Sequence, residues 1–149
     1  MKLEDEIKQS KFKSEYQKLE LNIIFTANWL EHHHGKHCKQ HDITSEQFNI
    51  LRILRGQYPN PATVNLLIER MLNKMSNASR LVEKLRKKGL VERKISKDDR
   101  RACDVIITKK GLALLSELDK LEKEWEKLVA HLSLDEARKL NTLLDKLRK

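Results

Sequence analysis

The chain has 149 residues and contains 31 Lys and Arg against 22 Asp and Glu, a formal net charge of +9 with a pI near 9.6. This length corresponds to one domain that can bury a core without disulfides, and no apolar run approaches the roughly 18 residues that cross a membrane. We therefore do not expect an integral membrane protein, and the basic balance favours a polyanionic partner.

The excess positive charge is confined to one segment. Residues 74–110 contain 13 basic and 5 acidic residues, whereas residues 1–73 contain 10 and 9, and residues 111–149 contain 8 and 8. A surface that is basic only for solubility would spread its charge along the chain. The distribution therefore predicts one polyanion-binding surface built from residues 74–110.

Four glycines and two prolines interrupt the 149 residues, which favours long helices with few turns and a mainly α fold. The two cysteines, Cys38 and Cys103, have no CxxC spacing, and the N-terminus has no signal-peptide pattern. These features favour a reducing, cytoplasmic compartment in which the protein has no disulfide.

The first half of the chain predicts two helices. Apolar residues recur at helical spacing in the second half of residues 3–34, and Gly35 is the expected stop of this first helix. In the next helix Thr44 is followed three residues later by Gln47, which is the pattern of a capping box. This second helix is expected to end near Gly56.

The middle of the chain predicts a compact series of short elements. The stretch "YPNPATV" is a prolyl turn into an extended piece, and "NLLIERML" is a short third helix. Asn73 is the expected cap of a fourth helix over residues 74–88, and Gly89 is its expected end. The buried face of this helix is predicted to consist of Met75, Ala78, Leu81, Val82 and Leu85.

Two strands and two helices complete the predicted elements. Residues 90–95 and 103–108 alternate as strands and flank the charged loop "SKDDRRA". One long helix is expected from residue 109 to about residue 132. Ser133 is followed three residues later by Glu136, and this capping box predicts the start of the last helix.

The order helix, turn, helix and two-stranded hairpin is that of a winged helix-turn-helix, a DNA-binding motif. The second helix of the pair enters the major groove and presents its N-terminal residues to base edges. Arg80 is the first candidate for reading a base. The predicted contacts of this helix are Ser76, Asn77, Ser79, Arg80 and Lys84.

The hairpin loop places Asp98 and Asp99 next to Arg100 and Arg101. A turn accounts for the aspartates, but it does not require arginines. An arginine at the tip of a hairpin can enter the negative minor groove, and neighbouring carboxylates can orient its guanidinium by bidentate pairing. We therefore expect the loop arginines to contact DNA.

Three motifs resemble the MarR family of bacterial transcriptional regulators in order and spacing. They are "RLVEKLRKKGLVER" (80–93), "DDRRA" (98–102) and "ITKKG" (107–111). The resemblance implies six helices and a small sheet in a homodimer. It also implies one domain over residues 1–149, in which residues 42–110 are the DNA-binding lobe and residues 1–35 and 111–149 are dimerisation helices.

The resemblance also assigns roles in DNA binding. The family's Asp-x-Arg pattern falls on Asp99 and Arg101, so Arg101 is the minor-groove candidate, Arg100 the candidate for a phosphate contact, and Lys97 a further wing contact. The implied target is double-stranded DNA with a pseudo-palindromic operator whose half-sites lie roughly 34 Å apart. A repressor is favoured over an activator because occupancy of an operator alone can block transcription.

Family members commonly respond to a small molecule, a metal or an oxidant. Ligands in the family lodge where the dimerisation helices meet the winged-helix lobe, which suggests Phe25, Trp29, Ile50 and Leu54 as lining residues, although each also suits a plain core. No cofactor is expected.

The stretch "EHHHGKHCKQH" (31–41) is a possible alternative sensor. His33, His37 and His41 are four residues apart and Cys38 is adjacent, a set that could bind zinc if the helix continued through Gly35. A metal-responsive regulator using residues 32–41 is thus an alternative. We expect Gly35 to break the helix and the histidines to be solvated. An oxidant sensor is disfavoured because the family's reactive cysteine near the start of the first helix has no counterpart.

Two other functional classes, an enzyme and an architectural DNA-binding protein, make different demands on the sequence. An enzyme would need a convergent acid, base or nucleophile set or a Gly-rich phosphate loop, and the sequence contains no such motif. A sequence-independent architectural DNA-binding protein remains an alternative, since charge alone gives affinity that collapses with salt. Only a preference for particular sites separates it from a regulator.

Overall fold

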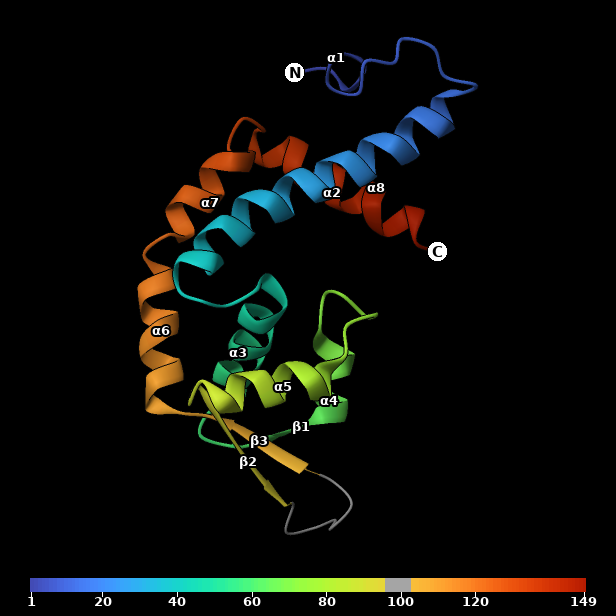
Figure 1. Cartoon of the computed structure of the whole chain (residues 1–149). Helices are drawn as coiled ribbons and strands as arrows, with labels where there is room; N and C mark the ends of the chain where they lie inside the picture. The colour runs from blue at the N-terminus through green and yellow to red at the C-terminus, as the bar shows by residue number, and fades with distance from the viewer. Residues whose placement is uncertain (96–102) are drawn as a thin grey trace.

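A computed structural model describes residues 1–95 and 103–149 of the chain. The helices are α1 (Leu3–Glu6), α2 (Glu15–Gln40), α3 (Ser45–Gln57), α4 (Val64–Arg70), α5 (Ala78–Lys87), α6 (Lys109–Asp119), α7 (Glu122–Val129) and α8 (Leu134–Leu147), and the strands are β1 (Ala62–Thr63), β2 (Val91–Ile95) and β3 (Cys103–Ile107). Figure 1 shows a lobe of α3, α4, α5 and the sheet, which α6 connects to a layer of α2, α7 and α8. This arrangement confirms the predicted mainly helical winged helix-turn-helix fold.

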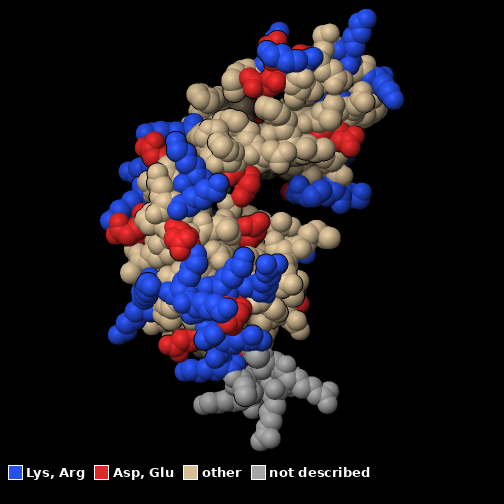
Figure 2. Space-filling model, in the orientation of Figure 1, with Lys and Arg blue, Asp and Glu red and all other residues tan. Residues whose placement is uncertain are grey.

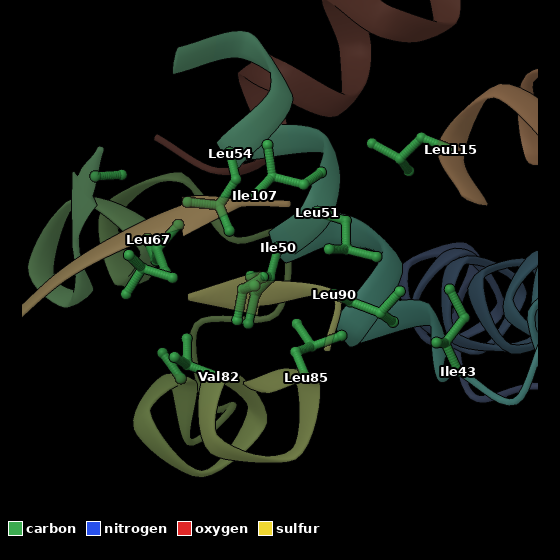
Figure 3. Close-up of a cluster of buried hydrophobic side chains, with 14 of the residues drawn as sticks. Ile43, Ile50, Leu51, Leu54, Leu67, Val82, Leu85, Leu90, Ile107 and Leu115 are labelled. Carbon is green, nitrogen blue, oxygen red and sulfur yellow. The ribbon is translucent and has the colours of Figure 1, made fainter. Parts of the chain in front are cut away.

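The core of the lobe is built from apolar residues at helical spacing. Ile50, Leu51 and Leu54 of α3 and Val82 and Leu85 of α5 belong to one cluster of buried side chains (Figure 3). Each such side chain contributes about 1.5–3 kcal/mol when it leaves water. The apolar face of α5 therefore packs in the core with α3, and the polar face of α5 points away from it.

The sheet has the strand order β1–β3–β2, and all its pairs are antiparallel. In the hairpin, Val91 pairs with Ile107 and Ile95 pairs with Cys103. The predicted strands are confirmed to within one residue. The described part of the hairpin ends at this second pair.

Two glycines lie where α5, the hairpin and α6 meet. Gly89 has a φ of +71° directly after the C-cap Lys88, as predicted for the end of this helix. At Gly111 a Cβ atom would lie 2.7 Å from Cγ1 of Ile107 and closer still to the carbonyl oxygen of Leu90. The glycine of "ITKKG" therefore allows α6 to begin against the hairpin.

The expected end of the first helix at Gly35 is wrong. Residues 7–14 separate a short α1 from α2, and α2 continues through Gly35 to Gln40. Glycine costs a helix only about 1 kcal/mol, which packing can offset. The Cβ position of Gly35 lies 3.5 Å from Oγ of Ser45, so the residue lies where α2 approaches the start of α3.

The helix expected over residues 109–132 is also wrong, because it is divided into α6 and α7 at Lys120 and Leu121. The chain changes direction at this point (Figure 1). The change brings the ring of Trp125 to 5.4 Å from the ring of Phe48, between centroids. With this division and the short α1, the described residues form more helical segments than the six that the resemblance implied.

Both predicted capping boxes are present. Thr44 and Gln47 cap α3, and Ser133 and Glu136 cap α8. The backbone N–H of Ser133 donates to the Glu136 carboxylate and lowers the pKa of that group. Within the part of the chain that the structure describes, no helix has the length and apolar character needed to cross a membrane.

Candidate nucleic-acid interface

The helix α5 begins later than predicted. Asn77, not Asn73, is the N-cap, and its side-chain oxygen accepts a hydrogen bond of 2.9 Å from the backbone N–H of Arg80. Both asparagines are good caps, but the helical spacing of the buried Ala78, Val82 and Leu85 selects the second. Two predicted contacts, Ser76 and Asn77, therefore precede the helix.

The polar face of α5 is exposed. Ser79, Arg80 and Lys84 lie on the side away from the core, as the sequence predicted, and Asn77 is exposed at the N-terminal end. Ser76 is only half-buried. Figure 2 shows Lys and Arg side chains gathered over α5 on the lobe. The structure thus brings the predicted recognition residues together on one accessible surface.

The cations of α5 differ in their local pairing. Arg86 donates two hydrogen bonds of 2.9 Å to Glu83, which lowers the pKa of Glu83 and raises the pKa of Arg86. Arg80 and Lys84 form no ion pair with the carboxylates of the described residues. Arg80 and Lys84 are therefore available to an external anion, as is the exposed Lys87 at the end of α5.

The predicted wing contacts Lys97, Asp99, Arg100 and Arg101 lie outside the described residues. The strands that flank them are described and end at the pair Ile95 and Cys103. In β2, Lys94 lies 3.7 Å from Glu92, and both side chains are exposed.

A long apolar groove lies between α2 and α8. Its cavity volume is about 740 Å³, and α8 presents Leu140, Leu143 and Leu147 to it with 45%, 52% and 55% of their surfaces exposed. From α2 the lining includes Leu19, Ile23 and Leu30. The apolar spacing of both helices could be predicted from the sequence. The open groove between α2 and α8 could not, because it depends on how the two helices are placed in space.

The four suggested effector-lining residues do not meet in one cavity. Phe25 and Trp29 line a cavity of about 150 Å³ between α2 and the N-terminal segment that contains α1. Ile50 and Leu54 are buried in the core of the lobe. The suggested set combined core residues with residues of a separate cavity, because sequence spacing does not give the distance between elements.

The His-rich stretch lies on a continuous helix, so the expected break at Gly35 does not argue against a metal site. His33 Nδ1 lies 2.7 Å from the carbonyl oxygen of Trp29, and the His34 and His37 rings lie against Trp125, at 5.3 and 6.3 Å between centroids. Among the described residues, no group of three or more His, Cys, Asp or Glu side chains could hold a metal ion.

Burial governs the chemistry of two groups near this helix end. It lowers the pKa of His34, and the charge of Glu31 opposes this shift. Burial also raises the pKa of the Cys38 thiol to about 11, which makes the reactive thiolate scarce near neutral pH. Nothing is described of the Cys103 side chain.

Comparison with known proteins identifies the fold and its relatives. Residues 41–102 match the model of the MarR family. Over 102 residues the chain is 28% identical to the HTH-type transcriptional regulator MhqR of Bacillus subtilis, covering 67% of this chain and 69% of that protein.

Solved structures of regulators superpose on most of the chain. A mutant MarR from E. coli complexed with operator DNA has a TM-score of 0.81 at 24% identity, covering 93% of this chain and 99% of that one. The organohalide-sensing regulator RdhR-CbdbA1625 in its 2,4-dichlorophenol-bound form has a TM-score of 0.81 at 19% identity, covering 94% and 85%. At these identities the structures support the fold, and with the sequence matches they confirm the predicted resemblance.

Proposed function

We propose that this chain is a transcriptional regulator of the MarR family that binds a pseudo-palindromic DNA operator as a homodimer and acts as a repressor. The observation that supports this most directly is the exposed face of α5, where Ser79, Arg80 and Lys84 point away from the core. Hydroxyl, guanidinium and ammonium groups on such a face can reach both base edges and phosphates in the major groove.

Within this face we assign Arg80 to a base and Lys84 to a phosphate. Arg80 lies in the first turn of α5, which is the part of a recognition helix that reaches base edges. Lys84 lies one turn later, where the helix passes the backbone. Asn77 holds the first turn through its side-chain cap and leaves its amide nitrogen free to contact DNA.

We assign minor-groove binding to the wing. This proposal rests on the sequence of residues 96–102 and on the described strands β2 and β3 that flank them and end at the pair Ile95 and Cys103. Arg101 is the proposed minor-groove residue and Asp99 its orienting carboxylate, while Arg100 and Lys97 contact phosphates.

The open groove between α2 and α8 supports dimerisation. The exposed leucines of its lining lie together in one groove, whereas a monomer commonly exposes single leucines that are scattered over its surface. A second copy could cover this groove with the same helices, since a two-fold interface uses the same patch on both subunits. The proposed dimer would set two α5 helices on successive turns of one face of the DNA.

We further propose that a small-molecule effector biases DNA binding at the junction of α2, α3 and α7. The support is a general one: the structurally similar RdhR is an organohalide sensor in a 2,4-dichlorophenol-bound form. In this chain Trp125 contacts residues of both α2 and α3, so a ligand that moved α7 would reach the lobe.

Selection of DNA sites from a random pool by the purified protein, at near-physiological salt, tests the proposed function. We expect enrichment of an inverted repeat whose half-sites are centred about one helical turn apart. Measurable binding without an enriched sequence would instead support an architectural protein, whose affinity comes from phosphate contacts alone.

A further inference from the structure

The turn between α4 and α5 exposes two large apolar side chains. Leu72 is 87% exposed and Met75 is 93% exposed, although Met71 and Ala78 on either side of them are buried. Met75 was predicted on the buried face of α5; that prediction is wrong, because Met75 precedes this helix and is exposed. In Figure 1 this turn projects from the lobe beside the N-terminal end of α5.

The turn is held by hydrogen bonds at several points. The backbone N–H of Leu72 donates to Oδ1 of Asn49 in α3 at 2.9 Å, and the backbone N–H of Met75 donates to Oδ1 of Asn73 at 3.0 Å. The ammonium of Lys74 donates to the carbonyl oxygens of Ile68 and Glu69. The two apolar side chains are therefore presented from a fixed backbone.

Exposed arginines flank the turn and would favour a polyanionic partner. The exposed Arg80 lies on the first turn of α5, and the exposed Arg70 ends α4. An apolar side chain among such cations cannot bind phosphate, but it can pack against the C5-methyl group of thymine, which is the apolar feature of the major groove. A cationic surface that also exposes Leu72 and Met75 is thus suited to DNA that contains thymine.

We propose that Met75, with Leu72 beside it, reads thymine methyl groups and is a determinant of operator specificity. This inference rests on the proposed DNA-binding function of α5. It adds an apolar contact from the preceding turn to the polar contacts of the helix. Because both side chains are almost fully exposed, their replacement by polar residues should leave the fold intact.

The test uses the site that the wild-type protein selects. Each thymine of one half-site is replaced in turn by deoxyuridine, which removes only the methyl group. We expect the wild type to lose about fourfold in affinity at one or two positions, the effect of one buried methyl group. Met75→Gln should bind the thymine site more weakly and be insensitive to uracil at the same positions.

Two variants serve as controls. Met75→Leu should retain the sensitivity to uracil, because it restores an apolar side chain. Leu134→Gln replaces another largely exposed apolar residue, at the start of α8, and should bind like the wild type. Leu72→Gln should reduce the sensitivity at the neighbouring thymine.

The outcomes separate this inference from the proposed function. If the wild type selects no site, the proposed function fails before the inference is tested with deoxyuridine. If it selects a site but Met75→Gln shows the same loss at every uracil position, Met75 does not read methyl groups. A change in the sedimentation of Met75→Gln would place the turn in a subunit interface and would also overturn the inference.

Discussion

The side chain of Asn77 accepts a hydrogen bond of 2.9 Å from the backbone N–H of Arg80, so the cap of α5 also fixes the backbone from which the first exposed cation projects. The orphan N–H groups of a helix start need such acceptors. One residue thus connects the stability of the lobe with the position of a proposed base contact.

Replacement of Asn77 by Ala should lower the free energy of unfolding by about 1 kcal/mol, the usual effect of losing a helix N-cap. Asn77→Asp should retain most of the stability, since a carboxylate also accepts from the N–H of Arg80. Urea denaturation without DNA measures both. Equal midpoints for the wild type and Asn77→Ala would show that the cap contributes nothing.

Arg80→Ala should weaken binding to the selected site by about 1–3 kcal/mol per half-site and relax the preference at one base pair. Lys84→Ala should weaken binding to all sequences alike and reduce the salt slope by about one per subunit, because a phosphate contact is lost. Fluorescence anisotropy at several salt concentrations separates the two.

A charge-matched control for these variants is Lys123→Ala, which removes an exposed cation from α7. It should bind like the wild type. If Lys123→Ala weakens binding as much as Arg80→Ala, the effect is one of net charge, and the assignment of Arg80 to a base is wrong.

Leu143→Glu should abolish dimerisation, because it places a charge in the apolar groove between α2 and α8. DNA binding should fall with it, since one half-site alone holds the monomer. Asn141→Glu introduces the same charge at an exposed position of α8 outside the groove and should remain dimeric. Sedimentation velocity reports both states, and a dimeric Leu143→Glu would remove the groove from the interface.

The stability of the protein should decrease as the pH falls below about 6.5. Burial lowers the pKa of His34 in the folded protein, so the unfolded chain binds a proton first, and stability present above the ordinary pKa is lost on acidification. Glu31 opposes the shift, whereas His33, His37 and Arg52 add to it.

His34→Gln should therefore show a smaller loss of stability between pH 7.5 and about 5.5 than the wild type does. His32→Gln removes an exposed imidazole from the same helix and serves as the control. Urea unfolding at the two values of pH gives the comparison. An identical pH dependence in wild type and His34→Gln would mean that other groups cause it.

The ends of helices could be predicted from the sequence where a single capping or stop motif was present. The capping boxes at Thr44 and Ser133 each marked a helix start to the residue, because each satisfies two backbone N–H groups within four residues. Gly89 marked the end of α5 for a similar local reason, since its positive φ is costly for other residues.

Sequence reasoning failed where two local signals competed or where packing decided. Asn73 and Asn77 are both capable caps, and only the burial of Ala78, Val82 and Leu85 selects the second. Gly35 is a local signal for a helix end, whereas α2 continues through it to Gln40 and approaches Ser45 at this point.

The distances between helices could not be predicted from the sequence. The groove between α2 and α8 joins residues that are more than 100 positions apart, and the suggested lining residues Phe25 and Ile50 belong to different environments. The polar face of α5 was predictable because helical periodicity assigns residues to faces without any knowledge of tertiary contacts.

The most direct test of the central claim compares the affinity of the wild-type protein for its selected duplex and for a scrambled duplex of equal length and composition, at near-physiological salt. A sequence-specific dimeric regulator should bind the selected duplex at least about a thousandfold more tightly, with two chains per duplex. Equal affinities for the two duplexes would contradict the account and identify binding by phosphate contacts alone.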